Sequence, residues 1–350
     1  MVTPGQDPVL QVENLVTTFP TEEGEIRAVD GASFEVGRGR ILAIVGESGC
    51  GKSVTAYSIL RLVERPGRIA AGRITLFPKG RDPIDITGLP EGSETLYQVR
   101  GGLISMIFQE PMTALSPVHT IGNQICEGIR LHREVTKAEA RGRAADMLTK
   151  VGIPRAEERL DLYPHELSGG MRQRAMIAMA LACGPELIIA DEPTTALDVT
   201  IQAQILSLIQ DLRRDTGVSV ILITHDLGVV AQTADEVAVM YLGRIVEKAP
   251  VRELMKSPRH PYTRGLLASL PGLSSARHAR LPSIRGSVPS LTAIPPGCPF
   301  HPRCPWQQAG RCDHGDPPPM EPVGDHREAA CLRVHEIEDL PEPAEAGAGA

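Results

Sequence analysis

One stretch of the chain has the residue types needed to bind the phosphates of a nucleotide. Residues 46–53 read Gly-Glu-Ser-Gly-Cys-Gly-Lys-Ser and match the pattern G-x-x-x-x-G-K-[ST] at every fixed position. The glycines lack a Cβ, so backbone N–H groups can converge on a phosphate. Lys52 adds a positive charge, and the Ser53 hydroxyl can bind Mg²⁺. The residues predicted to contact the nucleotide are Gly46, Glu47, Ser48, Gly49, Cys50, Gly51, Lys52, Ser53 and Val54.

The segments on either side of this loop are those that a phosphate site needs. The apolar residues 41–45 predict a buried strand, and residues 54–63 predict a helix whose positive N-terminal end faces the same phosphates. Cys50 lies beside Lys52 at this helix start, which predicts a lowered thiol pKa and reactivity toward thiol reagents.

Three further polar residues follow predicted strands and can serve phosphate chemistry. Asp191 and Glu192 end the apolar run 187–190, where a carboxylate can orient Mg²⁺ and its neighbour can polarise a water. His225 follows the apolar run 218–224 and can reach a γ-phosphate; a core or surface histidine is an equally good reading.

Two weaker signals lie in the first half of the chain. Gln109 follows the apolar run 103–108, and its amide can bind Mg²⁺ or orient a water. Phe19 lies just after a predicted strand in a chain with only 3% aromatic residues. Its ring can stack on adenine, although a core or turn aromatic is an equally good interpretation.

A second helix start has anion-binding character. Residues 167–171 read Leu-Ser-Gly-Gly-Met and precede a strong helix former. A hydroxyl and two glycines at a helix N-terminus (Ser168, Gly169 and Gly170) can bind a phosphate, whereas the simpler interpretation is a plain N-cap. The chain would then have two helix N-termini suited to phosphate binding but only one complete phosphate loop, and this favours the anion-binding interpretation.

The remaining pattern predicts an α/β fold with additional parts. Alternating residues at 9–18 and 28–36 predict an antiparallel β subdomain, and residues 110–165 predict an inserted helical subdomain. Within the latter, Thr136 and Glu139 form a capping box. A first domain over 9–250, with a mixed sheet as its core, is therefore expected.

Composition limits the possible functions and locations. A net charge of −7 argues against a nucleic-acid binder with a broad basic surface. The 350 residues contain no apolar stretch long enough to span a bilayer and begin without signal-peptide features, so we expect a cytoplasmic protein. Any membrane role would then act through partners.

The region 251–335 is rich in proline and needs a cross-link, such as a metal site, to stabilise its fold. Four clustered thiols in a reducing cytoplasm predict a metal site, and their spacing does not distinguish zinc from a [4Fe–4S] cluster. The acidic stretch 336–350 is expected to be disordered. The four predicted ligands are Cys298, Cys304, Cys312 and Cys331.

The order and spacing of these motifs resemble an ABC ATPase domain over residues 9–250, a P-loop NTPase fold. The resemblance makes 46–53 the Walker A loop, 167–171 the signature and Asp198 part of the D-loop. It implies that Gln109 senses the γ-phosphate, that Glu192 is the general base and that His225 is the γ-phosphate switch. Ser53, Gln109 and Asp191 are then the Mg²⁺ ligands, and Phe19 lies near the adenine-stacking position. Met171 replaces a glutamine that is common in the signature.

The later part is similar to the C-terminal extension of oligopeptide and dipeptide importer ATPases, a subfamily that includes nickel importers. Residues 260–271 (HPYTRGLLASLP) and the stretches around the four cysteines carry this similarity. It implies a second ATPase subunit, usually a paralogue, two membrane permeases and an extracytoplasmic solute-binding protein, with the chain on the cytoplasmic side of the membrane. It also favours [4Fe–4S] over zinc, since several members carry such a cluster.

Two interpretations from other classes remain at this stage. A soluble ABC ATPase acting on DNA or ribosomes would have two tandem cores or a long coiled coil, and the chain has neither pattern. A regulator that senses iron or redox state would need a cluster that changes oxidation state. For an importer ATPase, the signature would contact ATP held by the opposite subunit, so that ATP joins two ATPase domains and hydrolysis releases them.

Overall fold

The fold is described from a computed structural model. It describes residues 7–110, 114–195, 198–270 and 283–337. The predicted acidic tail lies outside these residues from position 338 onward, as do Ala196 and Leu197 of the predicted D-loop.

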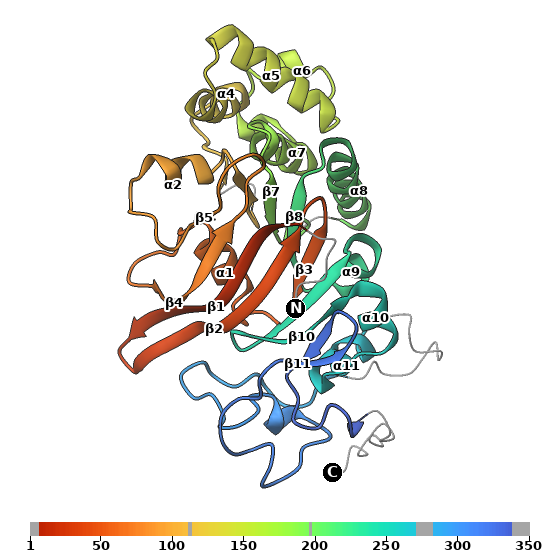
Figure 1. Cartoon of the computed structure of the whole chain (residues 1–350). Helices are drawn as coiled ribbons and strands as arrows, with labels where there is room; N and C mark the ends of the chain where they lie inside the picture. Colours follow the sequence, from red (N-terminus) through yellow and green to blue (C-terminus); the bar gives the residue numbers. More distant parts are fainter. Residues whose placement is uncertain (1–6, 111–113, 196–197, 271–282, 338–350) are drawn as a thin grey trace.

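An eight-stranded sheet forms the centre of the molecule, in the order β11-β12-β10-β9-β3-β8-β7-β6 (Figure 1). Strands β6, β7, β8, β3 and β9 run parallel, and β10, β12 and β11 add antiparallel pairs. All residues of β3, β7 and β8 are buried, as their continuous apolar runs predict for a sheet covered on both faces. The strands are β3 (Ile41–Val45), β6 (Ile104–Ile107), β7 (Leu187–Asp191), β8 (Ser219–Thr224), β9 (Glu236–Tyr241), β10 (Arg244–Pro250), β11 (Glu321–Gly324) and β12 (Arg327–Ala329).

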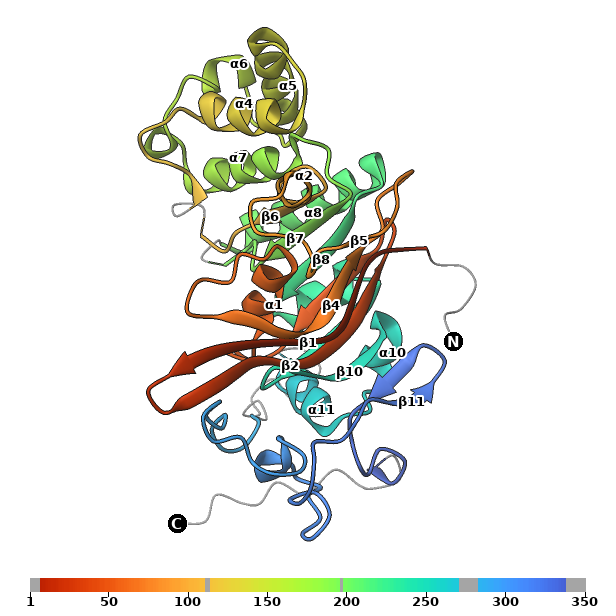
Figure 2. The same cartoon turned by 60° about the vertical axis from the view of Figure 1, so that its left-hand side comes forward.

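A second, antiparallel sheet has the order β2-β1-β4-β5. Its strands are β1 (Pro8–Thr21), β2 (Gly24–Gly37), β4 (Arg68–Leu76) and β5 (Ile84–Asp85). β1 and β2 extend beyond the predicted 9–18 and 28–36, because their pairing continues to Thr21 and Gly24 at the turn. Both views show this sheet (red to orange) beside α1 (Lys52–Ile59), and α2 (Glu94–Val99) lies near its edge (Figures 1 and 2). The mixed sheet and the antiparallel subdomain confirm the predicted fold class.

The inserted helices lie at one end of the molecule (Figure 1). They are α4 (Ile121–His132), α5 (Lys137–Lys150), α6 (Ala156–Arg159), the 3₁₀ turn η1 (Pro164–Glu166) and α7 (Gly169–Leu181). The predicted capping box forms: the backbone N–H of Glu139 donates to the Thr136 hydroxyl, and the Glu139 carboxylate accepts from the Thr136 N–H. Buried Ile125, Leu148 and Ile177 bring α4, α5 and α7 into one apolar core.

The remaining helices cover the main sheet and continue into the C-terminal extension. They are α8 (Val199–Thr216), α9 (Leu227–Thr233), α10 (Val251–Lys256), α11 (Pro261–Ala268) and the 3₁₀ turn η2 (His301–Arg303). The extension also supplies β11 and β12, and β12 pairs with β10 through Glu247 and Ala329. Both figures show the extension (blue) at the end opposite α4–α6. Within the described ranges, no helix has the length and apolar character needed to span a bilayer.

Glu247 holds the start of α11 against the main sheet. Its side chain is buried, and its carboxylate accepts hydrogen bonds from the backbone N–H groups of Arg259 and His260, both at 2.8 Å. Burial raises the pKa of Glu247, while the nearby Thr263 hydroxyl and the two backbone bonds act in the opposite direction. The carboxylate therefore satisfies donors that would otherwise be buried without acceptors.

We expect Glu247→Ala to lower the free energy of unfolding by about 3 kcal/mol, because two buried amide donors lose their acceptor. Urea denaturation followed by circular dichroism measures this. Glu253→Ala in neighbouring α10 is the matched control, since its side chain is half exposed, and we expect a change of less than about 0.5 kcal/mol. Equal effects of the two substitutions would contradict the role assigned to Glu247.

Candidate nucleotide-binding and hydrolysis site

The phosphate loop connects β3 to α1, and its glycines are required by close backbone contacts. A Cβ at position 46 would lie 2.2 Å from the carbonyl oxygen of Met240. Gly51 has φ +104°, and a Cβ there would lie 2.3 Å from the carbonyl oxygen of Ala28. Any larger residue would displace these neighbours, so the sequence pattern reflects tight packing between the loop and β2 and β9.

Lys52 lies inside the loop. Its side chain is only 5% exposed, and Nζ donates to the carbonyl oxygens of Gly46 at 2.9 Å and Glu47 at 3.0 Å. The loop therefore wraps around a buried ammonium group at the N-terminus of α1. This arrangement concentrates positive potential where phosphates would bind.

Asp191, at the end of β7, faces the start of α1. Burial raises the pKa of its carboxyl group, and a hydrogen bond with Ser53 and the nearby charge of Lys52 oppose that rise. Its side chain is 1% exposed, and its Oδ1 atom has no hydrogen-bond partner in the described structure. A buried carboxylate oxygen without a donor, beside a serine hydroxyl, fits a Mg²⁺ site.

Three predicted catalytic side chains meet at the ends of adjacent strands. The Glu192 carboxylate accepts a hydrogen bond from Gln109 Nε2 at 3.2 Å, and its other oxygen lies 3.4 Å from His225 Nδ1. Because β6, β7 and β8 are parallel neighbours, the residues that follow them lie at the same edge of the sheet. The structure thus brings together residues that are far apart in the sequence.

Two features hold Glu192 in place. Its backbone has φ +44°, a conformation that is uncommon outside glycine, and its N–H donates to the carbonyl oxygen of Ile223 at 2.9 Å. Thr195 Oγ1 donates to the Glu192 carboxylate at 2.8 Å. Thr195 did not stand out in the sequence; the only signal was a hydroxyl three residues after the acidic pair.

The predicted signature and D-loop residues lie at two neighbouring helix starts. Ser168 caps α7, and its hydroxyl accepts from the N–H of Met171 at 3.4 Å. Asp198 caps α8, and its carboxylate accepts from the N–H of Ile201 at 2.9 Å. A Cβ on Gly170 would lie 3.5 Å from Ile201, so the two helix starts are in contact. Ser168 and Asp198 therefore cap two helix starts that lie against each other.

Comparisons with known proteins agree with this geometry. Residues 29–195 match the ABC transporter family, and residues 246–312 match the oligopeptide/dipeptide transporter C-terminal region. A Brucella abortus protein is 50% identical over 95% of this chain and 99% of its own length. The oligopeptide transport ATP-binding protein OppD of Bacillus subtilis is 48% identical over 97% of this chain and 92% of its own. The chain belongs to the ATP-binding subunits of oligopeptide and dipeptide ABC transporters.

Solved structures support the same family. The ATP-binding cassette MJ0796, in a dimeric post-hydrolysis state bound to ADP and phosphate, matches with a TM-score of 0.61 and 26% identity, over 69% of this chain and 99% of its own. The cassette cbiO1 of Clostridium perfringens matches with a TM-score of 0.59 and 26% identity, over 72% of this chain and 92% of its own. As a member of this family, the chain is an ABC-type ATPase that binds ATP.

Phe19 lies near the end of β1, half-buried, with its ring against Gly67. A Cβ at position 67 would lie 2.3 Å from the ring, so glycine is needed there for the two segments to approach. Adenine stacking on this ring stays a prediction.

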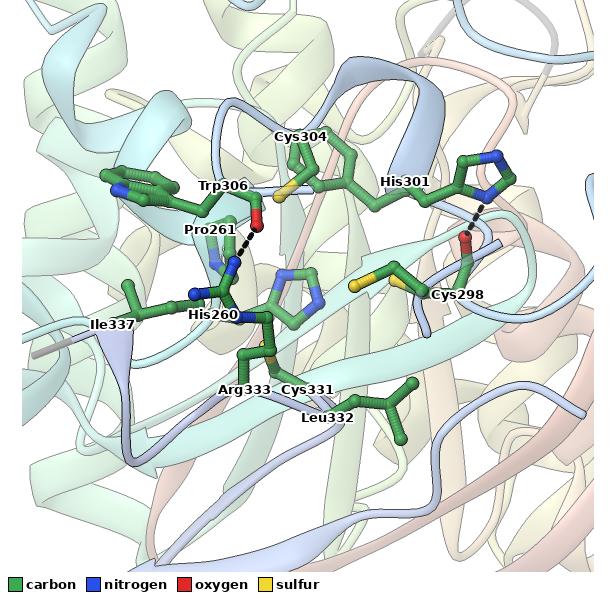
Figure 3. A pocket seen from close by; sticks show the side chains of 12 residues that line it. His260, Pro261, Cys298, His301, Cys304, Trp306, Cys331, Leu332, Arg333 and Ile337 are labelled. Carbon is green, nitrogen blue, oxygen red and sulfur yellow. Dashed lines mark hydrogen bonds between the residues drawn. The ribbon is translucent and has the colours of Figure 1, made fainter. Parts of the chain in front are cut away.

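The four predicted cysteine ligands line one small cavity in the extension (Figure 3). Its volume is about 20 Å³, and Phe300, His260 and Trp306 also line it. Burial raises the pKa of Cys298, and raises those of Cys304 and Cys331 to about 12 and about 11. As the side chains lie, no group of three or more His, Cys, Asp or Glu among the described residues is arranged to hold a metal ion.

The expectation for the Cys50 thiol was wrong. Cys50 is only 2% exposed, and burial raises its pKa although Lys52 is close. Its Sγ would lie 2.7 Å from a Cβ at position 46, so the thiol packs under the loop. The sequence placed a positive charge and a helix start nearby, but it did not show that desolvation would dominate.

We expect N-ethylmaleimide at pH 7.5 to label Cys50 at least about tenfold more slowly than the partly exposed Cys126, because the Cys50 thiol is buried and protonated. Peptide mapping by mass spectrometry measures both rates on one sample. Unfolding in urea is the control and should make the rates similar. Rapid labelling of Cys50 in the folded protein would contradict the assignment of a buried, protonated thiol.

Proposed function

We propose that this chain uses ATP hydrolysis to drive the import of short peptides through partner membrane permeases. The observation that carries the proposal is the meeting of Gln109, Glu192 and His225 beside the phosphate loop, in a chain that also has the oligopeptide-type extension. Relatives named for oligopeptide and dipeptide transport support the peptide cargo.

In the proposed site, Glu192 is the general base. It takes a proton from a water as the water oxygen bonds to the γ-phosphorus and the bond to the β–γ bridging oxygen breaks. Gln109 orients that water, and His225 contacts the γ-phosphate. The hydrogen bonds from Thr195 and Gln109 hold the carboxylate in position.

The remaining predicted residues bind the nucleotide and its cation. Lys52 and the backbone N–H groups of the loop bind the phosphates, and Lys52 leaves the Gly46 and Glu47 carbonyls to do so. Ser53 and Asp191 would hold Mg²⁺, with Gln109 as a further ligand. The cation would neutralise charge on the phosphate oxygens.

We assign the surface formed by the starts of α7 and α8 to a second ATPase subunit. Ser168, Gly169, Gly170 and Asp198 would contact ATP bound by that subunit. In both views α7, which begins at Gly169, lies with the inserted helices and away from α1, which follows the phosphate loop (Figures 1 and 2). ATP then joins two subunits, and hydrolysis separates them. A paralogue is the partner we propose.

The proposed assembly includes two permeases and an extracytoplasmic solute-binding protein, with this chain on the cytoplasmic face of the membrane. A groove of about 620 Å³ on α4 and α5 offers a site for the permeases. Leu131 lies in this groove and is 71% exposed, and Val118 nearby is 74% exposed. These two exposed apolar side chains are the observation that supports this assignment.

We expect Glu192→Gln to retain ATP binding and to reduce turnover at least about 100-fold, because the amide cannot accept the water proton. The assembled complex in vesicles provides both readouts, ATP hydrolysis and uptake of a labelled peptide. Uptake should stop, and the ATPase subunits should stay associated in ATP. Rapid hydrolysis by this variant would exclude Glu192 as the general base.

Two further variants make that experiment specific. Asp211→Asn, on an exposed part of α8, is the matched carboxylate control and should behave as wild type. Lys52→Ala should abolish ATP binding itself, in contrast to Glu192→Gln. If the wild-type complex hydrolyses ATP fully but takes up no peptide, the proposed ATPase activity stands and the peptide cargo is rejected.

We further propose that the cysteine cavity holds a [4Fe–4S] cluster. Four thiols from segments up to 33 positions apart converge there, and Cys₄ is the usual donor set for such a cluster. Burial opposes free thiolates, so iron would supply the charge that stabilises them. The side chains must rotate outward to admit it, since the present cavity has room for about one water.

We expect protein purified without oxygen to contain about four iron atoms per chain and to absorb visible light, and Cys304→Ser to lose both properties. Iron analysis with absorption spectroscopy measures this. Cys126→Ser is the matched control, because Cys126 lies on α4 outside the cavity. Zinc without iron, or no metal, would overturn the cluster.

A further inference from the structure

The C-terminal extension makes direct hydrogen bonds to the phosphate loop. Arg303, in η2, donates from Nη1 and Nη2 to the two carboxylate oxygens of Glu47, at 2.7 and 3.0 Å. The Tyr262 hydroxyl, in α11, accepts from the backbone N–H of Glu47 at 2.9 Å. One variable position of the loop is therefore held through both its side chain and its backbone.

The ion pair lies in a largely buried environment. The Arg303 side chain is 4% exposed and that of Glu47 is 28% exposed. The guanidinium carbon lies 5.9 Å from the ring centroids of Tyr241 and Phe300, and its Nε donates to the carbonyl oxygen of Arg285 at 3.1 Å. Bidentate Arg–carboxylate pairs fix direction as well as distance, so the pair restricts where the Glu47 side chain can lie.

The negative charge of Glu47 explains why this side chain needs a positively charged partner. Glu47 adds a carboxylate to a loop that binds several negatively charged phosphate oxygens, and like charges a few ångströms apart repel strongly where water is partly excluded. Arg303 neutralises this carboxylate and directs it toward the extension. The Tyr262 hydroxyl fixes the adjacent peptide, so the backbone of the loop keeps one orientation.

We propose that Arg303 is a positioning residue of the ATP site, which acts through Glu47 by neutralising its carboxylate and fixing the phosphate loop. The proposal deepens the proposed function, because it makes ATP affinity depend on the extension. Arg303 lies between Cys298 and Cys304, both of which line the cysteine cavity. The same short segment therefore contacts the phosphate loop and that cavity.

A double-mutant cycle on the full chain tests this, with binding of a fluorescent ATP analogue as the readout. We expect Arg303→Gln to weaken binding about fivefold or more, because it leaves the Glu47 carboxylate unpaired beside the phosphates. In a Glu47→Gln background, the same substitution should change affinity less than about twofold. Equal weakening in both backgrounds would overturn the proposal, since Arg303 would then not act through Glu47.

A structural role alone predicts a different result. Arg303→Gln would then lower the midpoint of thermal unfolding while ATP affinity stays within twofold of wild type, and this outcome would also overturn the proposal. Arg213→Gln is the matched control, since Arg213 forms a partly buried ion pair with Asp235, and we expect unchanged ATP affinity. If wild type itself fails to bind the analogue, the proposed ATP function fails rather than the role of Arg303.

If Arg303→Gln does not fold, Glu47 provides the same test from the loop side. Glu47→Asp keeps the charge but shortens the side chain, so the two-point bond to Arg303 is lost and the carboxylate stays closer to the phosphates. We expect this variant to bind the analogue at least about threefold more weakly than Glu47→Gln. Equal or tighter binding by Glu47→Asp would contradict the proposal.

Discussion

The parallel pairing of β3, β8, β7 and β6 is the constraint on which the proposed active site depends. Each strand is short, buried and apolar. Because the strands run parallel, the polar residues at their carboxyl ends leave the sheet at the same edge. The phosphate loop, Glu192 and His225 follow strands of this set, and Asp191 is the last residue of β7. A shift in pairing between β7 and β8 would separate Glu192 from His225, because their contact spans 33 positions of sequence.

Desolvation determines the chemistry of the Asp191 carboxyl group and of the buried cysteine thiols. The same burial that raises the pKa of Asp191 and leaves one of its oxygens without a donor makes it suitable for a cation. At Cys50, burial makes the thiol inert instead, although a lysine and a helix start lie close to it. In the extension, burial of three cysteine thiols favours their neutral forms. Nearby charges alone do not determine the pKa values of these groups, because the loss of contact with water contributes more.

The extension is part of the ATPase body in two physical ways. β12 continues the main sheet next to β10, which covers an edge that would otherwise expose unpaired backbone groups. Tyr262, Phe300 and Tyr241 pack as an aromatic group beneath the phosphate loop, with ring centroids 4.7 to 5.4 Å apart. The extension is thus stabilised by sheet pairing and aromatic packing as well as by any metal.

The sequence alone determined the parts of the ATP site that depend on local geometry. The phosphate-loop motif, the apolar strands and the Thr136–Glu139 capping box are patterns of residues close in the chain, so the sequence was sufficient to predict them. The contacts of the loop glycines with Met240 and Ala28 appear only in the tertiary structure. The tertiary structure decided what depends on distant neighbours: the meeting of Gln109, Glu192 and His225, the burial of Cys50, the addition of β12 to the sheet and the pairing of Arg303 with Glu47. These contacts join residues up to 256 positions apart, and a hydrogen bond of that span leaves no periodic signal in the sequence.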